Sequence, residues 1–400
     1  MPIDRRKFLT GVGTASGIAL AGCTGGPTGG GDGGDGGSES TPTATTEPTE
    51  ADDSDPDSDA DEETETEGEP ETESPTPSDP VNVGMVYATG GLGDGSFNDQ
   101  AQQGIQQAES DFGVSYGDAQ PSAVSEFKNF QQQFARSTDP TYELICCIGF
   151  LQASALSENA PDFPDQSFMI VDSVVEADNV ASYVFAEHEG SYLVGQLAGA
   201  LTTRDFSAGA GSTTADSASV GFVGGVESPL IRRFQAGYEA GVKAASEDVE
   251  VQTSYVGDFN APTAGREAAL AMYNSGADVV YHAAGNTGTG VFQAAQEQGK
   301  FAIGVDRDQS VTKESYANVI LASMVKRVDT AVYNSVEAIV NDEFEGGTTT
   351  ALGLDDDGVG IVYGQQLGSE IPGEVEEAIA GSRQSIIDGD ISVPTDPENV

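Results

Sequence analysis

From Val81 onward the chain alternates short apolar segments with amphipathic ones, and this alternation is the strongest constraint on its fold. The apolar segments predict strands at Val81–Ala88, Tyr142–Phe150, Ser167–Val171, Val180–Phe185, Ser219–Gly224, Val251–Tyr255, Val279–Ala283, Phe301–Gly304 and Val319–Ser323. The amphipathic segments predict helices that include Phe97–Phe112, His188–Leu201, Pro229–Ser246, Ala264–Ser275, Gly290–Gln298 and Val325–Val340. Continuous apolar strands that alternate with helices are typical of parallel sheets covered on both faces. The predicted fold class is therefore α/β, with doubly wound parallel sheets.

The segment after Val81 is too long for one common domain. It holds about 320 residues, which suggests two domains. A small, polar and glycine-rich stretch from Thr202 to Ser219 interrupts the alternation, and a new strand follows it. We expect the chain to pass from the first domain to the second within this stretch.

The first 23 residues have the three parts of an export signal. A twin arginine precedes the apolar segment Phe8–Leu20, which is too short to cross a bilayer. The twin arginine is typical of a twin-arginine export signal, and the small residues before Cys23 are typical of a lipoprotein processing site. We therefore predict that Cys23 is lipidated. The alternative is a generic signal peptide with an incidental cysteine.

The segment from Thr24 to Pro80 predicts a disordered tether. It holds 19 acidic residues, no basic ones and almost no apolar ones, so burial cannot offset its chain entropy. Charge repulsion and prolines should extend it. A lipid at one end and a folded domain at the other predict a protein held on the extracellular face of the cell membrane.

The formal net charge of the chain is -50, and the tether explains only part of it. From Val81 onward, 46 acidic residues stand against 13 lysines and arginines. This balance argues against nucleic-acid binding, which needs basic patches. Because salt screens repulsion between surface charges, the broad acidity favours a halophilic source.

Cys146 and Cys147 are adjacent in a predicted strand. Neighbouring strand side chains point to opposite faces, so a bond between these two would be strained, and we expect buried free thiols. The only histidines are His188 and His282, and no zinc-type spacing occurs. We predict no metal and no cofactor.

The residues that follow the predicted strands form a coherent set. Ligands of such sheets bind beyond the carboxyl ends of the strands. The set contains two aromatic rings, several carboxylates, one amide and one lysine: Asp94, Phe97, Asn98, Asp172, Asp258, Phe259, Asp306, Asp308 and Lys326. Two longer segments, Val226–Phe234 and His282–Gly290, also follow strands.

Each member of this set also has an ordinary structural interpretation. The glycine-rich segments Gly90–Asp99 and Gly285–Gly290 could simply form turns, and neither has the Lys-Ser/Thr pair of a phosphate loop. Asp94 and Asp99 could suggest a metal site, but they lack the regular oxygen spacing of a calcium loop. An aspartate after a strand, such as Asp306, is often a helix cap.

The other members are open to the same interpretation. Phe97 and Phe259 would by default be core residues, and His282 a structural polar residue. Lys326, which precedes Arg327, would ordinarily lie on a solvated helix face.

The order of the segments is more specific than any one of them, and it resembles the basic membrane protein family. This family, also called the purine nucleoside receptor lipoproteins, consists of substrate-binding proteins of ABC importers. The similar motifs are GGLGDGSFND at Gly90–Asp99 and the segments Val174–Gly199, Phe222–Ala245, Tyr255–Ser310, Ser323–Tyr333 and Gly353–Ile361. The resemblance runs in order from Val81 to about Gly368.

The resemblance implies a type I periplasmic-binding-protein fold. Two similar α/β lobes would be joined by three crossings, with the ligand between them. The first lobe would comprise residues 81–206 plus 327–353, and the second 207–326 plus 354–400. The later crossings would lie just beyond Ser323–Met324 and near Gly353–Asp357.

The resemblance also implies how a ligand would be held. Phe97 and Phe259 would sandwich a purine base, and Asn98 and Asp172 would hydrogen-bond its edge. Asp306 would hold the ribose hydroxyls.

Lys326 would hold the ribose together with Asp306, and pairing between the two would keep Asp306 ionised. Gly285 would allow close backbone approach. Where the family commonly has two acidic residues, this chain has Gly93-Asp94, so we keep Asp94 as a ligand-binding candidate and not position 93.

We therefore expect a monomeric, non-enzymatic protein that binds a nucleoside and delivers it to the ABC permease subunits in the membrane. Carboxylates at the site would repel a phosphate, which favours nucleosides over nucleotides. The alternative is the same fold binding another small polar ligand, such as a sugar, or acting as a ligand sensor. A nucleoside hydrolase is the third hypothesis, but no loop holds the cluster of aspartates that a calcium-dependent hydrolase would need.

Overall fold

The computed structural model describes residues 80–400. The predicted signal peptide, Cys23 and the tether before Pro80 lie outside the described residues.

The first sheet has six strands in the order β13-β5-β4-β3-β1-β2. They are β1 (Asn82–Val86), β2 (Ser115–Ala119), β3 (Leu144–Cys147), β4 (Ser167–Val171), β5 (Val180–Phe185) and β13 (Thr348–Leu352). All neighbours in this sheet pair in parallel. The central strands are buried apolar runs, as a sheet covered on both faces requires.

The second sheet repeats this arrangement in the order β14-β12-β11-β10-β8-β9. Its strands are β8 (Ser219–Gly224), β9 (Glu250–Tyr255), β10 (Val279–Ala283), β11 (Phe301–Asp306), β12 (Ile320–Lys326) and β14 (Val359–Tyr363). Matched from the β13 and β14 edges, each strand of one sheet has a counterpart in the other. One difference is that β14 runs antiparallel to β12, whereas β13 runs parallel to β5.

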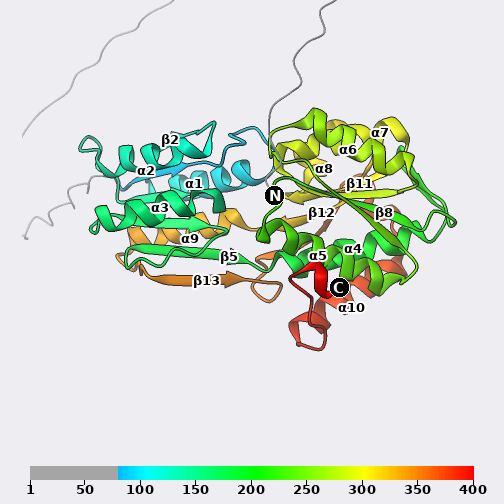
Figure 1. Cartoon of the computed structure of the whole chain (residues 1–400). Helices are drawn as coiled ribbons and strands as arrows, with labels where there is room; N and C mark the ends of the chain where they lie inside the picture. The colour runs from blue at the N-terminus through cyan, green and yellow to red at the C-terminus, as the bar shows by residue number, and fades with distance from the viewer. Residues whose placement is uncertain (1–79) are drawn as a thin grey trace, which may run out of the picture. The chain divides into compact units, whose positions relative to one another are not determined.

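Helices cover both faces of each sheet (Figure 1). The first lobe contains α1 (Phe97–Phe112), α2 (Phe127–Ala135), α3 (Ala153–Asn159) and α9 (Val328–Val340). The second contains α4 (Glu187–Thr202), α5 (Pro229–Ala245), α6 (Pro262–Asn274), α7 (Gly288–Gln298), α8 (Gln309–Thr312) and α10 (Gly373–Ile387). The α/β prediction of two doubly wound lobes is confirmed. Among residues 80–400, no helix is long and apolar enough to span a membrane.

The two adjacent cysteines illustrate how the sheet faces divide. Cys146 packs in the apolar cluster that contains Ile105 of α1 and Val332 of α9. Cys147 packs in the opposite cluster, with Phe127 of α2. Both thiols are free and buried, and burial raises the pKa of each.

The chain crosses between the lobes three times: after β5, after β12 and between β13 and β14. The first crossing comes before α4, because α4 packs on α5 of the second lobe. A side chain at Gly195 or Gly241 would collide with the backbone of the opposite helix, at 2.2 and 2.0 Å from a carbonyl oxygen, so glycine permits this close packing. This differs from the predicted first lobe of residues 81–206, which would include α4.

The polar stretch that suggested the earlier crossing instead forms a small hairpin. Its strands are β6 (Phe206–Ala208) and β7 (Gly211–Thr213), which pair antiparallel. Gly209 in the hairpin turn lies against the backbone of Asn318 in the second lobe. The composition of this stretch therefore reflects a tight turn.

Candidate functional site

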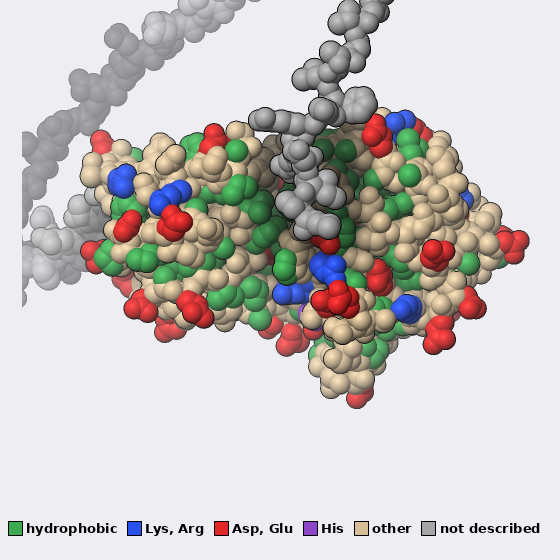
Figure 2. Space-filling view, viewed as in Figure 1, with side chains coloured by type: hydrophobic (Ala, Val, Ile, Leu, Met, Phe, Trp, Pro, Cys, Tyr) green, Lys and Arg blue, Asp and Glu red, His purple; other side chains and the backbone are tan. Residues whose placement is uncertain are grey.

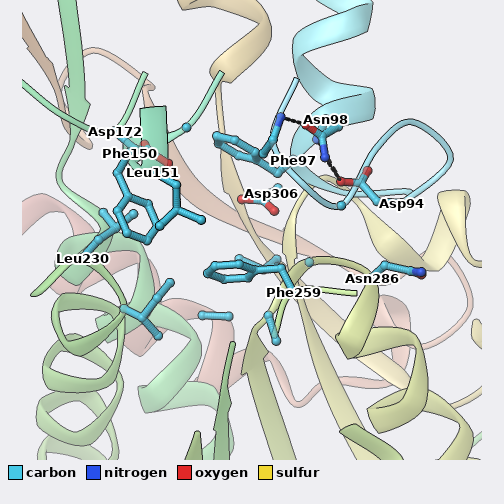
Figure 3. Close-up of a pocket in the computed structure, with 18 of the residues that line it drawn as sticks. Asp94, Phe97, Asn98, Phe150, Leu151, Asp172, Leu230, Phe259, Asn286 and Asp306 are labelled. Carbon is cyan, nitrogen blue, oxygen red and sulfur yellow. Dashed lines mark hydrogen bonds between the residues drawn. The ribbon is translucent and has the colours of Figure 1, made fainter. Parts of the chain in front are cut away.

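A cavity lies between the carboxyl ends of the two sheets, with about 660 Å³ of space between its atoms. Figure 3 shows side chains from both lobes pointing into it. All eight residues predicted as ligand-binding line this cavity: Asp94, Phe97, Asn98, Asp172, Phe259, Gly285, Asp306 and Lys326. They come from segments up to 232 residues apart, brought together because parallel strands end at the same sheet edge.

The loop that precedes α1 is held by two aspartates. Asp94 accepts hydrogen bonds from the backbone N–H of Ser96 at 2.8 Å and of Asn98 at 2.9 Å. Asp99 accepts from the N–H groups of Gly93 and Gly95, both at 2.7 Å. These bonds stabilise the turn and the start of the helix. Burial raises the pKa of Asp94, although the hydrogen bonds that its own loop donates act to lower it.

Asn98 is also used to fix the loop. Its Oδ1 accepts from the N–H of Ala88 at 2.9 Å, and its Nδ2 donates to Asp94 at 3.1 Å, as Figure 3 shows. An amide Nδ2 carries two protons, so one N–H of Asn98 remains for a ligand.

Two aromatic rings face the cavity from opposite lobes. Phe97 is the first residue of α1, and Phe259 follows β9. In Figure 3 the two rings lie above and below the cavity, with the Asp306 carboxylate at the side of the gap between them. The ring of Phe150 packs edge-on against Phe259, with centroids 6.3 Å apart and an interplanar angle of 81°.

The backbone permits close approach beneath Phe259. Gly285 has a φ of +54°, and a Cβ there would lie 3.2 Å from the carbonyl oxygen of Phe259. Asp258, the other residue of this turn noted in the sequence, does not line the cavity and accepts from the N–H of Asn260 at 2.8 Å.

Asp306 ends β11 with its backbone in the left-handed region, at a φ of 65°. Its Oδ2 accepts from the Ser96 hydroxyl of the opposite lobe at 2.5 Å. Burial raises the pKa of Asp306 to about 6, although Lys326 and Ser96 act to lower it. A buried carboxylate in a strained backbone conformation is typical of a functional position.

Lys326 is buried beside three aromatic rings. Its Nζ lies 2.7 and 2.9 Å from the two oxygens of Asp172. Its distance from the ring centroids is 5.0 Å for Phe97 and 5.4 Å for both Phe185 and Phe234. Burial acts to lower the pKa of Lys326, but the surrounding carboxylates outweigh it and raise the pKa above its usual value.

The pairing of Lys326 differs from the prediction. The sequence analysis paired it with Asp306, whereas the structure pairs it with Asp172. Lys326 ends β12, and Asp172 follows β4 of the other lobe. This ion pair therefore joins the two lobes. Lys326 acts on Asp306 only by electrostatic attraction, which lowers the pKa of that carboxyl.

Glu187 is a third acidic group in this cluster and was absent from the predicted set. It begins α4, is fully buried, and lies 3.8 Å from Lys326 and 3.1 Å from Arg233. Its Oε1 has no hydrogen-bond partner. Burial raises the pKa of Glu187 to about 7.

His282 lies in β10 behind the cavity and does not line it. Its Nε2 lies 2.9 Å from Oε1 of Gln309. Burial lowers the pKa of His282 to about 3, so the ring is neutral at ordinary pH. Within residues 80–400, no cluster of three or more histidine, cysteine or acidic side chains could hold a metal ion.

Comparison with known proteins now gives the family. Residues 81–397 match the family model Bmp, described as "ABC transporter substrate-binding protein PnrA-like". The chain belongs to the Bmp family.

Two curated Bmp relatives match most of their own length. The "CD4+ T-cell-stimulating antigen" of Listeria monocytogenes is 38% identical over 80% of this chain and 90% of its own. The "ABC transporter nucleoside-binding protein BmpA" of Lactococcus lactis is 33% identical over 78% of this chain and 88% of its own.

A solved structure shares the fold. An ABC-transporter solute-binding protein from Aeropyrum pernix K1 superposes with a TM-score of 0.70 at 28% identity, over 80% of this chain and 95% of its own. This Bmp-family chain is therefore a substrate-binding protein of an ABC transporter and not an enzyme. Its partners are a small-molecule ligand and ABC permease subunits.

Several lining residues of this Bmp-family site were missed by sequence reasoning. They form the apolar wall of the cavity and comprise Phe150, Leu151, Leu230, Ile231 and Phe234. Phe150 and Leu151 follow β3, so the rule of strand ends could have found them. The other three lie within the first turns of α5, where an apolar residue is indistinguishable from core in a sequence.

Proposed function

We propose that this chain binds a nucleoside with a purine base between its two lobes. The observation that carries this proposal is the pair of rings from Phe97 and Phe259, which face each other across the cavity with the Asp306 carboxylate at the side (Figure 3). A base has two flat apolar faces, and stacking on an aromatic ring contributes about 0.5–1.5 kcal/mol beyond burial. A carboxylate that accepts from vicinal hydroxyls contributes about 1.5–3 kcal/mol per bond.

The remaining polar groups suit the edges of such a ligand. The free N–H of Asn98 and the unused lone pairs of Asp172 would recognise the base edge. Asp306 and Lys326 would hold the ribose hydroxyls, and Gly285 would let the backbone approach the ligand. Asp94 would act by holding Asn98 in place.

The charge of the cavity favours a nucleoside over a nucleotide. Its described lining includes three carboxylates, from Asp94, Asp172 and Asp306, and one ammonium, from Lys326. That ammonium is already paired with Asp172. A phosphate would meet excess negative charge in a buried site, where repulsion is poorly screened.

A screen of unfolding temperature tests this function. The full chain would be unfolded in multimolar KCl with inosine, adenosine, hypoxanthine, ribose or inosine monophosphate. At 100 times its dissociation constant a ligand adds about 2.7 kcal/mol to the free energy of unfolding. We expect this from nucleosides and not from ribose or the monophosphate. Stabilisation by a sugar alone would establish the alternative of a sugar-binding protein.

We also propose that the protein is a monomer anchored by a lipid on Cys23 at the extracellular face of the membrane, after twin-arginine export. Support comes from the signal and tether in the sequence. The acidic side chains spread over the face seen in Figure 2 suit a high-salt environment. Replacing Cys23 by serine should release the protein from the membrane fraction, and retention of the variant would contradict the anchor.

A further inference from the structure

Contacts between the lobes also occur away from the three crossings. The backbone carbonyl of Gly95 accepts from Oγ1 of Thr312 at 2.8 Å and from Nε2 of Gln309 at 3.3 Å. The neighbouring Ser96 hydroxyl donates to Asp306. We call Gly95 and Ser96 of the first lobe, with Asp306, Gln309 and Thr312 of the second, the closure contact.

The turn at Gly95 also packs against Lys313 of the second lobe. Gly95 has a φ of +62°, and a Cβ there would lie 2.6 Å from Cε of Lys313 in the opposite lobe. Nearby, Arg307 donates to Oε1 of Gln103 on α1 at 2.9 Å. The crossings follow Phe185, Lys326 and Leu352, so a hinge motion there could break the closure contact without deforming either sheet.

Gln309 links the closure contact to the interior of the second lobe. Its side chain is fully buried, and Oε1 accepts from the N–H of Val305 at 2.8 Å and contacts His282. Its own N–H donates to the Ser323 hydroxyl at 3.0 Å. Through its side chain and its backbone N–H, Gln309 thus joins β10, β11 and β12 to the opposite lobe.

This network surrounds the strained residue Asp306. A non-glycine residue at positive φ is uncommon and persists only where its surroundings fix it. Val305, bonded to Gln309, precedes Asp306 directly, and Ser96 holds the carboxylate from the other side. Lobe closure and the orientation of Asp306 are therefore tied to the same contacts.

We propose that Ser96, Gln309 and Thr312 are positioning residues, which hold Asp306 in its ligand-binding orientation and slow ligand release by keeping the lobes closed. The proposal rests on the proposed nucleoside function. It adds Ser96, which donates to Asp306 from the opposite lobe, Gln309, which accepts from Val305, and Thr312, which donates to the Gly95 carbonyl beside Ser96. The energy of the closure contact is available only when both lobes meet, so its loss should act on dissociation more than on association.

Dissociation of tritiated inosine from the full chain tests this proposal. Ser96→Ala and Thr312→Val each remove a hydroxyl that crosses between the lobes. We expect each to raise the dissociation rate constant by about five- to tenfold and to change the association rate constant by less than about twofold. Ser335→Ala is the matched control, since this buried hydroxyl bonds only the Ala331 carbonyl of its own helix, and it should leave both constants unchanged.

The pH profile separates positioning from a merely structural role. The Ser96 hydroxyl acts to lower the pKa of Asp306. In Ser96→Ala the decline of inosine affinity on acidification should therefore begin at a higher pH than in the wild type. An unchanged profile together with unchanged dissociation rates would overturn the proposal.

Hydrogen–deuterium exchange gives a readout that needs no ligand. In Thr312→Val we expect faster exchange in residues 90–98 and 306–316 together, with α9 unchanged. Faster exchange confined to 306–316 would overturn the closure contact. If the wild type binds no inosine, the proposed function fails, and this exchange experiment still decides whether the lobes are held as described.

Discussion

Asp172 and Asp306 occupy equivalent positions in the two lobes. Asp172 directly follows β4 and Asp306 ends β11, the third strands from the β13 and β14 edges of their sheets. Both have left-handed backbones, with φ values of 68° and 65°. Each carboxylate is held from the opposite lobe, Asp172 by Lys326 and Asp306 by Ser96. The repeated fold thus supplies one strained carboxylate from each side of the cavity.

Asp306→Asn should weaken inosine binding at least tenfold, about 1.4 kcal/mol. Asparagine tolerates the left-handed backbone, so the lobe should stay folded. Because burial raises the pKa of Asp306 from its usual 3.8 to about 6, the ionised carboxylate lowers the stability of the native state at pH 7, and the variant should gain of order 1–3 kcal/mol of stability. Isothermal titration and urea unfolding would measure both effects.

The control for that variant is Asp308→Asn. Asp308 caps α8 by accepting from the N–H of Ser310 at 3.0 Å and does not line the cavity. Its replacement should leave affinity unchanged. Equal affinity losses in both variants would mean that the turn, and not the Asp306 carboxylate, determines binding.

Phe97→Ala and Phe259→Ala should each weaken inosine binding at least tenfold, about 1.4 kcal/mol, because each removes one stacking face. Phe206→Ala is a matched control, since the Phe206 ring packs on Phe301 with centroids 5.4 Å apart and lies outside the cavity lining. The control should lose stability without losing affinity. Unchanged affinity in both cavity variants would show that the site is misplaced.

Lys326→Met should destabilise the fold by about 3–5 kcal/mol, because it leaves Asp172 as an uncompensated buried charge. Urea unfolding measures the loss. The double variant Lys326→Met with Asp172→Asn removes that stranded charge and should recover part of the lost stability. A double variant as unstable as the single one would argue against the ion pair as the cause.

Glu187→Gln should change how stability depends on pH. Burial raises the pKa of Glu187 from its usual 4.5 to about 7, so the wild type binds a proton on folding between these values and gains stability as pH falls from about 8 to 5. The variant lacks this gain.

The stability of Glu187→Gln relative to wild type should therefore be greatest at pH 8 and should decline toward pH 5. Urea unfolding of both proteins across this range isolates the effect, because His188 and His282 titrate alike in each. A pH-independent difference would contradict the assignment.

The sequence predicted most of the fold because the central strands are buried on both faces. β4, β5, β8 and β10 have the predicted bounds, and α1 also agrees. Of the four edge strands, β9 was predicted, and β2, β13 and β14 were missed. β2 (SYGDA) and β13 (TTTAL) are half-exposed and carry no continuous apolar run. An edge strand pairs on one side only and is partly exposed, so its sequence carries little of the apolar pattern that predicts a strand.

The cavity-lining residues could also be predicted from the sequence, because the carboxyl ends of parallel strands meet at one edge of a sheet. The hydrogen-bond and ion-pair partners of these side chains could not be predicted in this way. Lys326 could reach several carboxylates, and the choice of Asp172 depends on how the two lobes meet at the crossing. Nothing in the sequence distinguishes Ser96 or Gln309 from their neighbours, and only the contacts between lobes give them a role.

A structure of the full chain crystallised with inosine tests the central claim most directly. We predict that the base lies between Phe97 and Phe259, about 3.5 Å from each ring, with the ribose hydroxyls on Asp306. A base outside the gap between these rings, or a ribose that contacts neither Asp306 nor Lys326, would contradict it.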